Sequence, residues 1–165
     1  MSDCLFCKII AWEIPSVKIR EDEDFIAILD VFPNTKWMTL VMPKNHYDSD
    51  LFEINDQSFY TKYLLAVSKV VAILKKWLKI NRVSMVMEWM WIDHLHIKLY
   101  PLHWVWPEWK EYRAKQEIFF DQYQWYISTQ LWPKADFDQL QKTADEIKKD
   151  AETSLVLGEV IGKEV

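Results

Sequence analysis

The segment Ile92-Asp93-His94-Leu95-His96-Ile97-Lys98-Leu99 alternates polar and aliphatic residues over its last six positions. A period of two predicts a β-strand, here over residues 94–100, with one apolar face. His94, His96 and Lys98 then lie on the opposite face, at spacings of roughly 7 Å. Two imidazoles and an ammonium group suit a surface that attacks and neutralises a phosphate. Solvated or hydrogen-bonded bystander side chains are the alternative.

Around this strand the sequence predicts an α+β fold. Further strands are expected over residues 17–20, 25–29, 38–42 and 83–87. A helix capped by Asn55 or Asp56 should run to residue 79, because apolar residues recur at i, i+3 and i+4 along it. Two more helices are expected over residues 107–126 and 136–152. Five strands with a long helix before the fourth indicate an antiparallel sheet packed on helices.

The composition is that of one globular domain. Half of the 165 residues are hydrophobic, and no apolar run approaches the length of a membrane span. A net charge of −5 argues against nucleic acid as a partner of the whole chain. We expect a cytoplasmic protein, because no apolar leader is present and the two cysteines stand as C-x-x-C, which argues against a structural disulfide.

Four segments precede the histidines in a recognisable order: residues 4–10 (CLFCKII), 13–16 (EIPS), 25–30 (FIAILD) and 39–46 (TLVMPKNH). With His94-Leu95-His96, they resemble the histidine triad (HIT) family of nucleotide hydrolases and transferases, over residues 3–101. The family fold has the shape described above and commonly pairs into a homodimer. We therefore expect a HIT-like core over residues 1–104, and a helical C-terminal extension of the same domain over residues 105–165.

The resemblance implies that His96 is the nucleophile that forms a nucleotidyl-histidine intermediate. Lys98 stands where the family has its third histidine, so we expect a phosphate contact there, with a solvated strand lysine as the alternative. A second departure is Trp89-Met90, where many members read Gly-Gln. Glu88, near the histidine strand, could be functional, with a solvated acid at a strand end as the usual alternative.

Cys4, Cys7, His46 and His94 make a candidate zinc site. Two cysteines and two histidines are a valid tetrahedral ligand set. The resemblance supports it, because zinc-binding members of the family use these positions. The alternative is two free thiols and two uncoordinated imidazoles. Zinc would have a structural role, joining the N-terminus to the sheet.

The resemblance also implies a purine nucleotide as the small-molecule partner. Asp30 would contact the ribose hydroxyls, unless it only caps a turn. The base would lie among apolar residues that could equally be ordinary core: Phe6, Ile9, Ile28 and Val31. Two functions follow: a hydrolase or transferase for nucleoside 5′-phosphate derivatives, or a non-catalytic, zinc-stabilised nucleotide-binding module.

Ten tryptophans and only two glycines make the composition unusual. Average usage of about 7% predicts roughly 12 glycines in this length. Several tryptophans stand where the family or the local pattern calls for glycine, among them Trp12, Trp37, Trp77, Trp89 and Trp91. Our hypothesis is that tryptophan replaces about nine glycines, the alternative being a naturally tryptophan-rich protein. We expect glycine at such positions to stabilise the fold.

Overall fold

The computed structural model describes residues 3–88, 91–108, 110–111, 120–124, 136, 138, 141 and 142. The chain divides into two compact units, Met1–Lys110 and Glu111–Val165. Almost all of the described residues belong to the first unit, and the elements below lie within it. No helix in the described part of the chain is long and apolar enough to cross a membrane.

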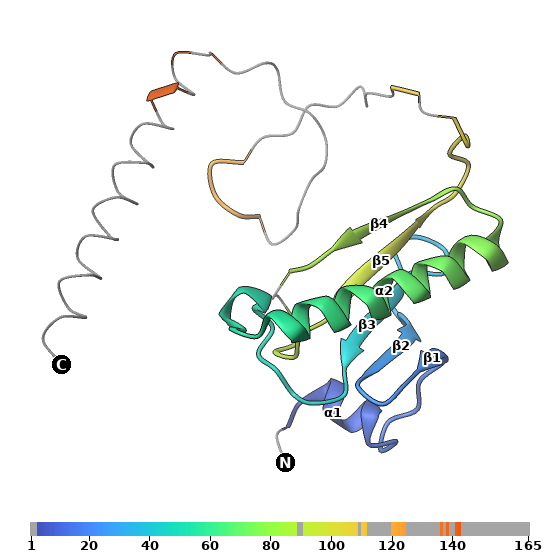
Figure 1. Ribbon diagram of the computed structural model, residues 1–165, viewed down its shortest axis with the longest axis vertical. Coiled ribbons are helices and arrows are strands. Elements are labelled where there is room, and N and C mark those ends of the chain that lie inside the picture. Colours follow the sequence, from blue (N-terminus) through green and yellow to red (C-terminus); the bar gives the residue numbers. More distant parts are fainter. Residues whose placement is uncertain are drawn as a thin grey trace, which may run out of the picture. The chain divides into compact units, whose positions relative to one another are not determined.

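One five-stranded antiparallel sheet forms the centre of the first unit (Figure 1). Its strands are β1 (Lys18–Glu21), β2 (Phe25–Leu29), β3 (Thr39–Pro43), β4 (Arg82–Val86) and β5 (Ile97–Leu102). Their spatial order is β1-β2-β3-β5-β4, so β4 lies at one edge. The predicted α+β fold with a five-stranded antiparallel sheet is confirmed.

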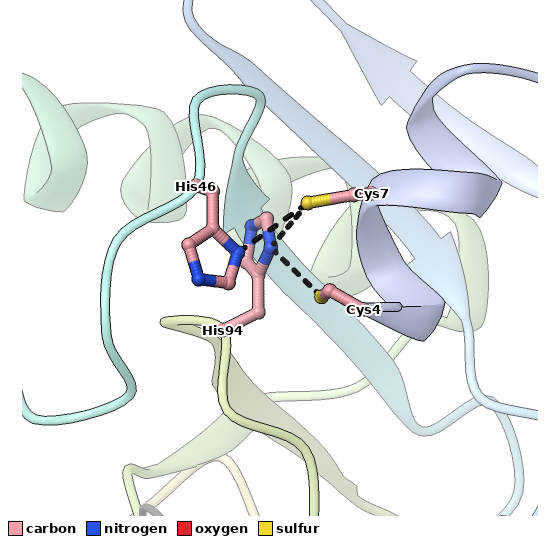
Figure 2. Close-up of side chains that lie close together, drawn as sticks. All are labelled: Cys4, Cys7, His46 and His94. Atoms are coloured by element: carbon pink, nitrogen blue, oxygen red, sulfur yellow. Dashed lines mark hydrogen bonds between the residues drawn. The ribbon is translucent and has the colours of Figure 1, made fainter. Parts of the chain in front are cut away.

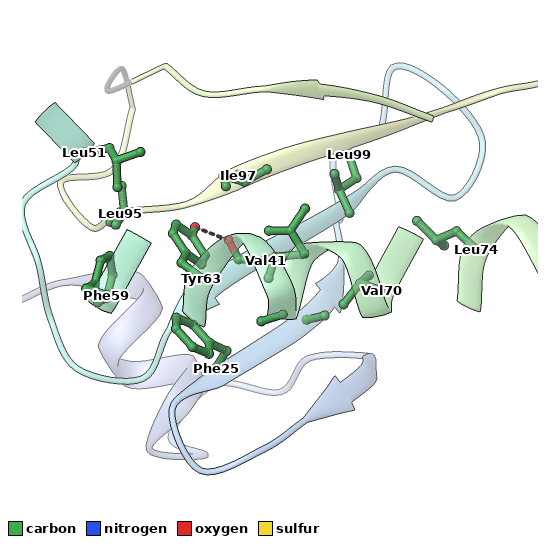
Figure 3. Close-up of a cluster of buried hydrophobic side chains, with 13 residues drawn as sticks. Phe25, Val41, Leu51, Phe59, Tyr63, Val70, Leu74, Leu95, Ile97 and Leu99 are labelled. Carbon is green, nitrogen blue, oxygen red and sulfur yellow. Dashed lines mark hydrogen bonds between the residues drawn. The ribbon is translucent and has the colours of Figure 1, made fainter. Parts of the chain in front are cut away.

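The long helix α2 (Gln57–Leu78) covers one face of this sheet (Figure 3). It begins at Asp56, whose carboxylate accepts hydrogen bonds from the backbone N–H groups of Ser58 and Phe59. Its apolar stripe packs in one cluster with residues of three strands: Phe25 and Ala27 of β2, Val41 of β3, and Ile97 and Leu99 of β5. The buried Tyr63 hydroxyl donates a 2.7 Å hydrogen bond to the Val41 carbonyl, which ties the helix to the central strand.

The short helix α1 (Leu5–Ile10) packs on the opposite face. Phe6 and Ile9 join a second core cluster formed by the residues of β2 and β3 that point away from α2, together with the neighbouring Met38. These are Ile26, Ile28, Leu40 and Met42. A single-turn 3-10 helix, η1 (Leu51–Glu53), precedes α2. The sheet is therefore covered on both faces, and the histidine segment lies on the α1 side.

The predicted strand over residues 94–100 is placed too early. β5 begins at Ile97, and His94 and His96 precede its ladder. The alternation of faces nevertheless extends through them, because Leu95, Ile97 and Leu99 are all fully buried in the α2 cluster. The physical reason for the shift is that the rings of both histidines hydrogen-bond backbone carbonyls. The His94 ring bonds the carbonyl of Pro43 at the end of β3, and the His96 ring bonds the carbonyl of His94.

The predicted C-terminal helices lie largely outside the described residues. Within residues 107–126, the described positions 107–108, 110–111 and 120–124 are not helical. Within 136–152, positions 138, 141 and 142 are helical. The extension over residues 105–165 therefore stays a prediction.

Four tryptophans adopt left-handed backbone conformations. Their φ angles are 65° at Trp12, 67° at Trp37, 85° at Trp91 and 65° at Trp104. Such angles cost an L-residue roughly 1–2 kcal/mol and cost glycine almost nothing. This observation supports the hypothesis that these four positions suit glycine. Trp77 does not fit it, because it lies inside α2 and the left-handed residue that ends the helix is Lys79.

We therefore predict that Trp12→Gly, Trp37→Gly and Trp104→Gly each raise the free energy of unfolding by about 1 kcal/mol. Urea denaturation of each variant beside the parent measures this. Trp77→Gly is the matched control and should lower stability by about 0.5 kcal/mol, since glycine is a poorer helix former. Equal stability of the parent and all three variants would show that these backbone angles carry no strain.

Candidate functional site

Two cysteines and two histidines from three separate segments converge on the α1 side of the sheet (Figure 2). Cys7 lies in α1, and Cys4 precedes its first residue. His46 comes from the loop after β3, and His94 from the segment before β5. Their ligand atoms all lie within 4.8 Å of one another. The structure thus brings together all four residues of the predicted metal site.

Three of the distances between donor atoms in this cluster match the edges of a tetrahedral metal site. The His94 Nδ1 lies 3.5 Å from the Cys4 Sγ and 3.6 Å from the Cys7 Sγ, and the His46 Nδ1 lies 3.4 Å from the Cys7 Sγ. Zinc bonds of about 2.3 Å to sulfur and about 2.0–2.1 Å to nitrogen place these atoms about 3.6 Å apart on a tetrahedral edge. The donor set and its geometry therefore fit a zinc ion.

The tautomer of His94 suits this role. Its Nε2–H donates a 2.9 Å hydrogen bond to the Pro43 carbonyl, which can only accept. The lone pair is therefore on Nδ1, the atom that faces the two sulfurs. The ring is fully buried, and burial lowers the pKa of His94, which favours the neutral form that binds metals.

The loop that carries His46 is fastened to the segment before β5. The exposed Asp93 accepts hydrogen bonds from both the backbone N–H and the hydroxyl of the buried Ser49, each at 3.0 Å. These two bonds lower the pKa of the Asp93 carboxyl. They hold the His46 loop next to His94. The contact between Ser49 and Asp93 was not predicted from the sequence.

His96 is the second buried imidazole of the segment. Its Nδ1–H donates a 2.7 Å hydrogen bond to the His94 carbonyl, so its lone pair is on Nε2. The ring packs edge-on against Phe6, with centroids 5.1 Å apart. Burial lowers the pKa of His96 despite that hydrogen bond. A neutral imidazole with a fixed tautomer has the electronic form of a nucleophile.

Lys98 is not a solvated strand lysine. Its ammonium group forms an ion pair with the Glu88 carboxylate, and the two side chains are only 13% and 12% exposed. Of the two alternatives for Glu88, the solvated acid at a strand end is therefore wrong. The antiparallel register indicates the contact between Glu88 and Lys98, because Val86 of β4 pairs with Lys98 and Glu88 follows two residues beyond the end of that strand. The long loop between the strands hides that register from the sequence.

The predicted nucleotide contacts are partly assembled. Phe6, Ile9 and Ile28 are buried in one cluster. Val31 is 75% exposed in the turn after β2. Asp30 caps that turn, because one carboxylate oxygen accepts a 2.8 Å hydrogen bond from the Phe32 N–H. The roles in base and ribose binding stay predictions, and Trp89 and Met90 lie outside the described residues.

An antiparallel sheet covered on both faces, with buried histidines beside a Cys₂His₂ cluster, defines the class of fold, and comparison with known proteins identifies the family. The profile of the HIT domain matches residues 11–104. The chain belongs to the HIT family, as its sequence motifs predict.

The relatives include "Protein hit" of Bacillus subtilis, 42% identical over 73 residues, which cover 44% of this chain and 49% of that protein. The adenosine 5′-monophosphoramidase hnt1 of Schizosaccharomyces pombe is 31% identical over 98 residues, covering 59% of this chain and 73% of that protein. The chain thus matches about half the length of the bacterial relative.

Among solved structures, SMU.412c from Streptococcus mutans UA159 superposes with a TM-score of 0.65 at 31% identity. The match covers 92% of this chain and 87% of that chain. The structural similarity is therefore not limited to the short sequence motifs that identify the family.

We predict that Asp93→Ala lowers the free energy of unfolding by about 1 kcal/mol, because it leaves two donors of the buried Ser49 without their acceptor. The low end of the usual range applies because Asp93 is solvent-exposed. Asp48→Ala, an exposed residue of the same loop, is the control and should change stability by less than about 0.5 kcal/mol. Chemical denaturation measures the free energy of unfolding of both variants. Equal changes in the two would show that Asp93 does not hold the His46 loop in place.

Proposed function

We propose that this protein is a hydrolase or transferase for nucleoside 5′-phosphate derivatives, of the dinucleoside polyphosphate or nucleoside phosphoramidate type. The observation that carries the proposal is the buried imidazole of His96, whose Nδ1–H is engaged by the His94 carbonyl. That hydrogen bond leaves the Nε2 lone pair available for attack on phosphorus. The name of the Schizosaccharomyces pombe relative, an adenosine 5′-monophosphoramidase, supports the substrate class.

In the proposed reaction, the Nε2 of His96 bonds to the α-phosphorus as the bond to the leaving group breaks. The leaving group departs with the bonding electron pair. Water or another acceptor then attacks the same phosphorus, and the nitrogen–phosphorus bond breaks, which restores the imidazole. Lys98 would balance the negative charge that gathers on the non-bridging oxygens.

The proposal assigns nucleotide binding to the residues on the α1 side. Asp30 would contact the ribose hydroxyls through its carboxylate, and the purine would lie near the apolar side chains of Phe6, Ile9, Ile28 and Val31. The cluster of the first three supports this assignment, since they border the ring of His96 through Phe6.

Zinc is the metal that we propose for Cys4, Cys7, His46 and His94. It would hold α1 against the sheet and fix the histidine segment, and it takes no part in the reaction. The sulfurs of both cysteines face the histidines of the cluster. Thiols used as metal ligands and not as a disulfide support a reducing compartment, so we propose a cytoplasmic protein. A homodimer is also part of the proposal, supported by the edge strand β4 and its half-exposed Met85.

A non-catalytic, zinc-stabilised nucleotide-binding module is the second candidate. One observation favours it: Lys98 occupies the third histidine position and is engaged by Glu88. Trapping a covalent adduct on His96 separates the two functions.

We predict near-stoichiometric zinc in protein purified without added metal, measured by elemental analysis. Cys4→Ala and Cys7→Ala should each lower the zinc content strongly, because three ligands bind far more weakly than four. His103→Ala is the control, because that histidine lies outside the cluster and hydrogen-bonds the Lys36 carbonyl. Unchanged zinc content in both cysteine variants would show that Cys4 and Cys7 do not bind the metal.

We predict that mixing the protein with a nucleotide substrate produces an acid-labile nucleotidyl adduct, seen by rapid quenching and intact-mass measurement. His96→Ala should abolish it. Lys98→Ala should slow its formation by about 10²-fold or more, because charge stabilisation is lost. An adduct that persists in His96→Ala would exclude His96 as the nucleophile.

We predict that Asp30→Ala weakens AMP binding by about 1.5–3 kcal/mol, the range for a charge-assisted hydrogen bond. Calorimetric titration of AMP measures this. Asp30→Ala should leave binding of inorganic phosphate unchanged, because phosphate has no ribose. The titration is repeated in Trp89→Gly/Trp91→Gly, where we expect tighter binding. If AMP binds parent and Asp30→Ala equally, the ribose assignment is incorrect.

A further inference from the structure

Cys4 and Cys7 lie one helical turn apart, which suits a chemical modification as well as metal binding. Cys4 directly precedes α1 and Cys7 lies in its first turn, where the Lys8 N–H donates a 3.2 Å hydrogen bond to the Cys4 carbonyl. Residues three apart in such a turn have Cα atoms about 5 Å apart, within the range of about 4.4–6.8 Å that a disulfide spans. The two sulfurs, at most 4.8 Å apart, can therefore bond after rotation of their side chains.

The Cys₂His₂ cluster is accessible from solvent. His46 is exposed and both cysteines are partly exposed, whereas His94 is fully buried. A small neutral oxidant such as hydrogen peroxide can therefore reach the two sulfurs in the folded protein. Cysteines bind a metal as thiolates, and the thiolate is also the form that peroxides oxidise.

Two neighbouring thiolates and one molecule of hydrogen peroxide give a balanced reaction. One thiolate attacks a peroxide oxygen, the O–O bond breaks, and a sulfenic acid and a hydroxide ion form. The second thiolate attacks the sulfenic sulfur, so that the S–S bond forms as the S–O bond breaks and a second hydroxide ion leaves. With two protons from the solvent, the products are one disulfide and two waters, and the peroxide has accepted the two electrons that the sulfurs lost.

We propose that Cys4 and Cys7 form an oxidation site, at which a peroxide converts the two metal-binding thiolates to a disulfide and the metal ion is released. A disulfide sulfur carries no thiolate charge, so His46 and His94 would remain as the ligands of the cluster. Two imidazoles bind zinc far more weakly than the full set of four ligands. This inference rests on the zinc assignment and goes beyond the proposed reaction, because it concerns what controls the metal.

Release of the metal has a consequence for α1, which carries the cysteines. A disulfide joins two residues of the same helical turn and no longer connects α1 with the His46 loop and the His94 segment. Apolar packing of Phe6 and Ile9 then holds α1 on the sheet. The Phe6 ring lies edge-on to the rings of His94 and His96, with centroids 5.8 Å and 5.1 Å away. Oxidation therefore loosens the contact between α1 and the proposed nucleophile.

The test treats the zinc-loaded parent with hydrogen peroxide and follows thiols, peptide mass and free zinc together. The chain holds 2 cysteines, and both lie in the tryptic peptide 1–8. We expect both thiols to disappear, this peptide to become about 2 Da lighter by the loss of two hydrogens, and zinc to be released as the thiols are lost. Dithiothreitol with added zinc should reverse all three changes. Thiols that resist peroxide, zinc that stays bound after both thiols are lost, or cysteines that gain oxygen instead would overturn the proposal.

The double variant Cys4→Asp/Cys7→Asp separates thiol oxidation from other damage by peroxide. It keeps four groups that can bind zinc but contains no thiol. It should retain zinc at peroxide concentrations that empty the parent, and equal release from both proteins would exclude the cysteines as the cause. If this variant binds no zinc, the thiol, mass and zinc measurements on the parent decide alone. A parent purified without zinc would overturn the metal assignment and this inference with it.

Two further measurements follow the consequence for α1 and the nucleotide site. Trypsin should cleave after Lys8 at least about tenfold faster in the oxidised protein, because proteolysis follows local opening, whereas cleavage after Lys69 in α2 is the control and should keep its rate. Equal cleavage after Lys8 in both forms would show that α1 stays attached. AMP binding, measured by calorimetry, should weaken on oxidation and recover on reduction with zinc. Equal AMP affinity in both forms would overturn the link to the nucleotide site alone, and AMP binding by neither form would overturn the proposed function but not the oxidation site.

Discussion

The burial of Leu95, Ile97 and Leu99 beneath α2 is the constraint on which the site depends. All three side chains have no exposed surface, and they fix the face on which each neighbouring residue lies. Because the chain is extended through this segment, His94, His96 and Lys98 must point to the α1 side. A shift of one residue would expose three aliphatic side chains and bury three polar ones against α2, which would cost several kcal/mol.

Backbone carbonyls then decide the chemistry of the two buried imidazoles. The Pro43 carbonyl accepts a hydrogen bond from the Nε2–H group of His94. The His94 carbonyl accepts one from the Nδ1–H group of His96. His94 therefore connects the Cys₂His₂ cluster with His96. Its ring faces the two cysteines, and its backbone carbonyl accepts the hydrogen bond from the His96 ring. Any displacement of His94 would change the orientation of the His96 ring as well.

Much of this arrangement could be predicted from the sequence, because it follows from periodicity and local capping. The period of two around His94 predicted the faces, and Asp56 followed by an apolar stripe predicted α2. The start of β5 was missed because ring-to-carbonyl bonds are invisible in the sequence. The ion pair of Glu88 with Lys98 was not predicted because it depends on a strand register set across a loop. Trp77 was misjudged because the residue that ends α2 in a left-handed conformation is Lys79, two positions later.

The four donors of the Cys₂His₂ cluster are dispersed along the chain, with Cys4 and His94 separated by 90 residues. Closing a loop of that length is entropically costly in an unfolded chain. The pairing of β3 with β5 and the docking of α1 bring the donors within reach, so the cluster exists only in the tertiary fold. An ion held there would act as a reversible crosslink between the two ends of the fold, comparable to a disulfide that closes a long loop. Unlike a disulfide, such a crosslink does not need an oxidising compartment.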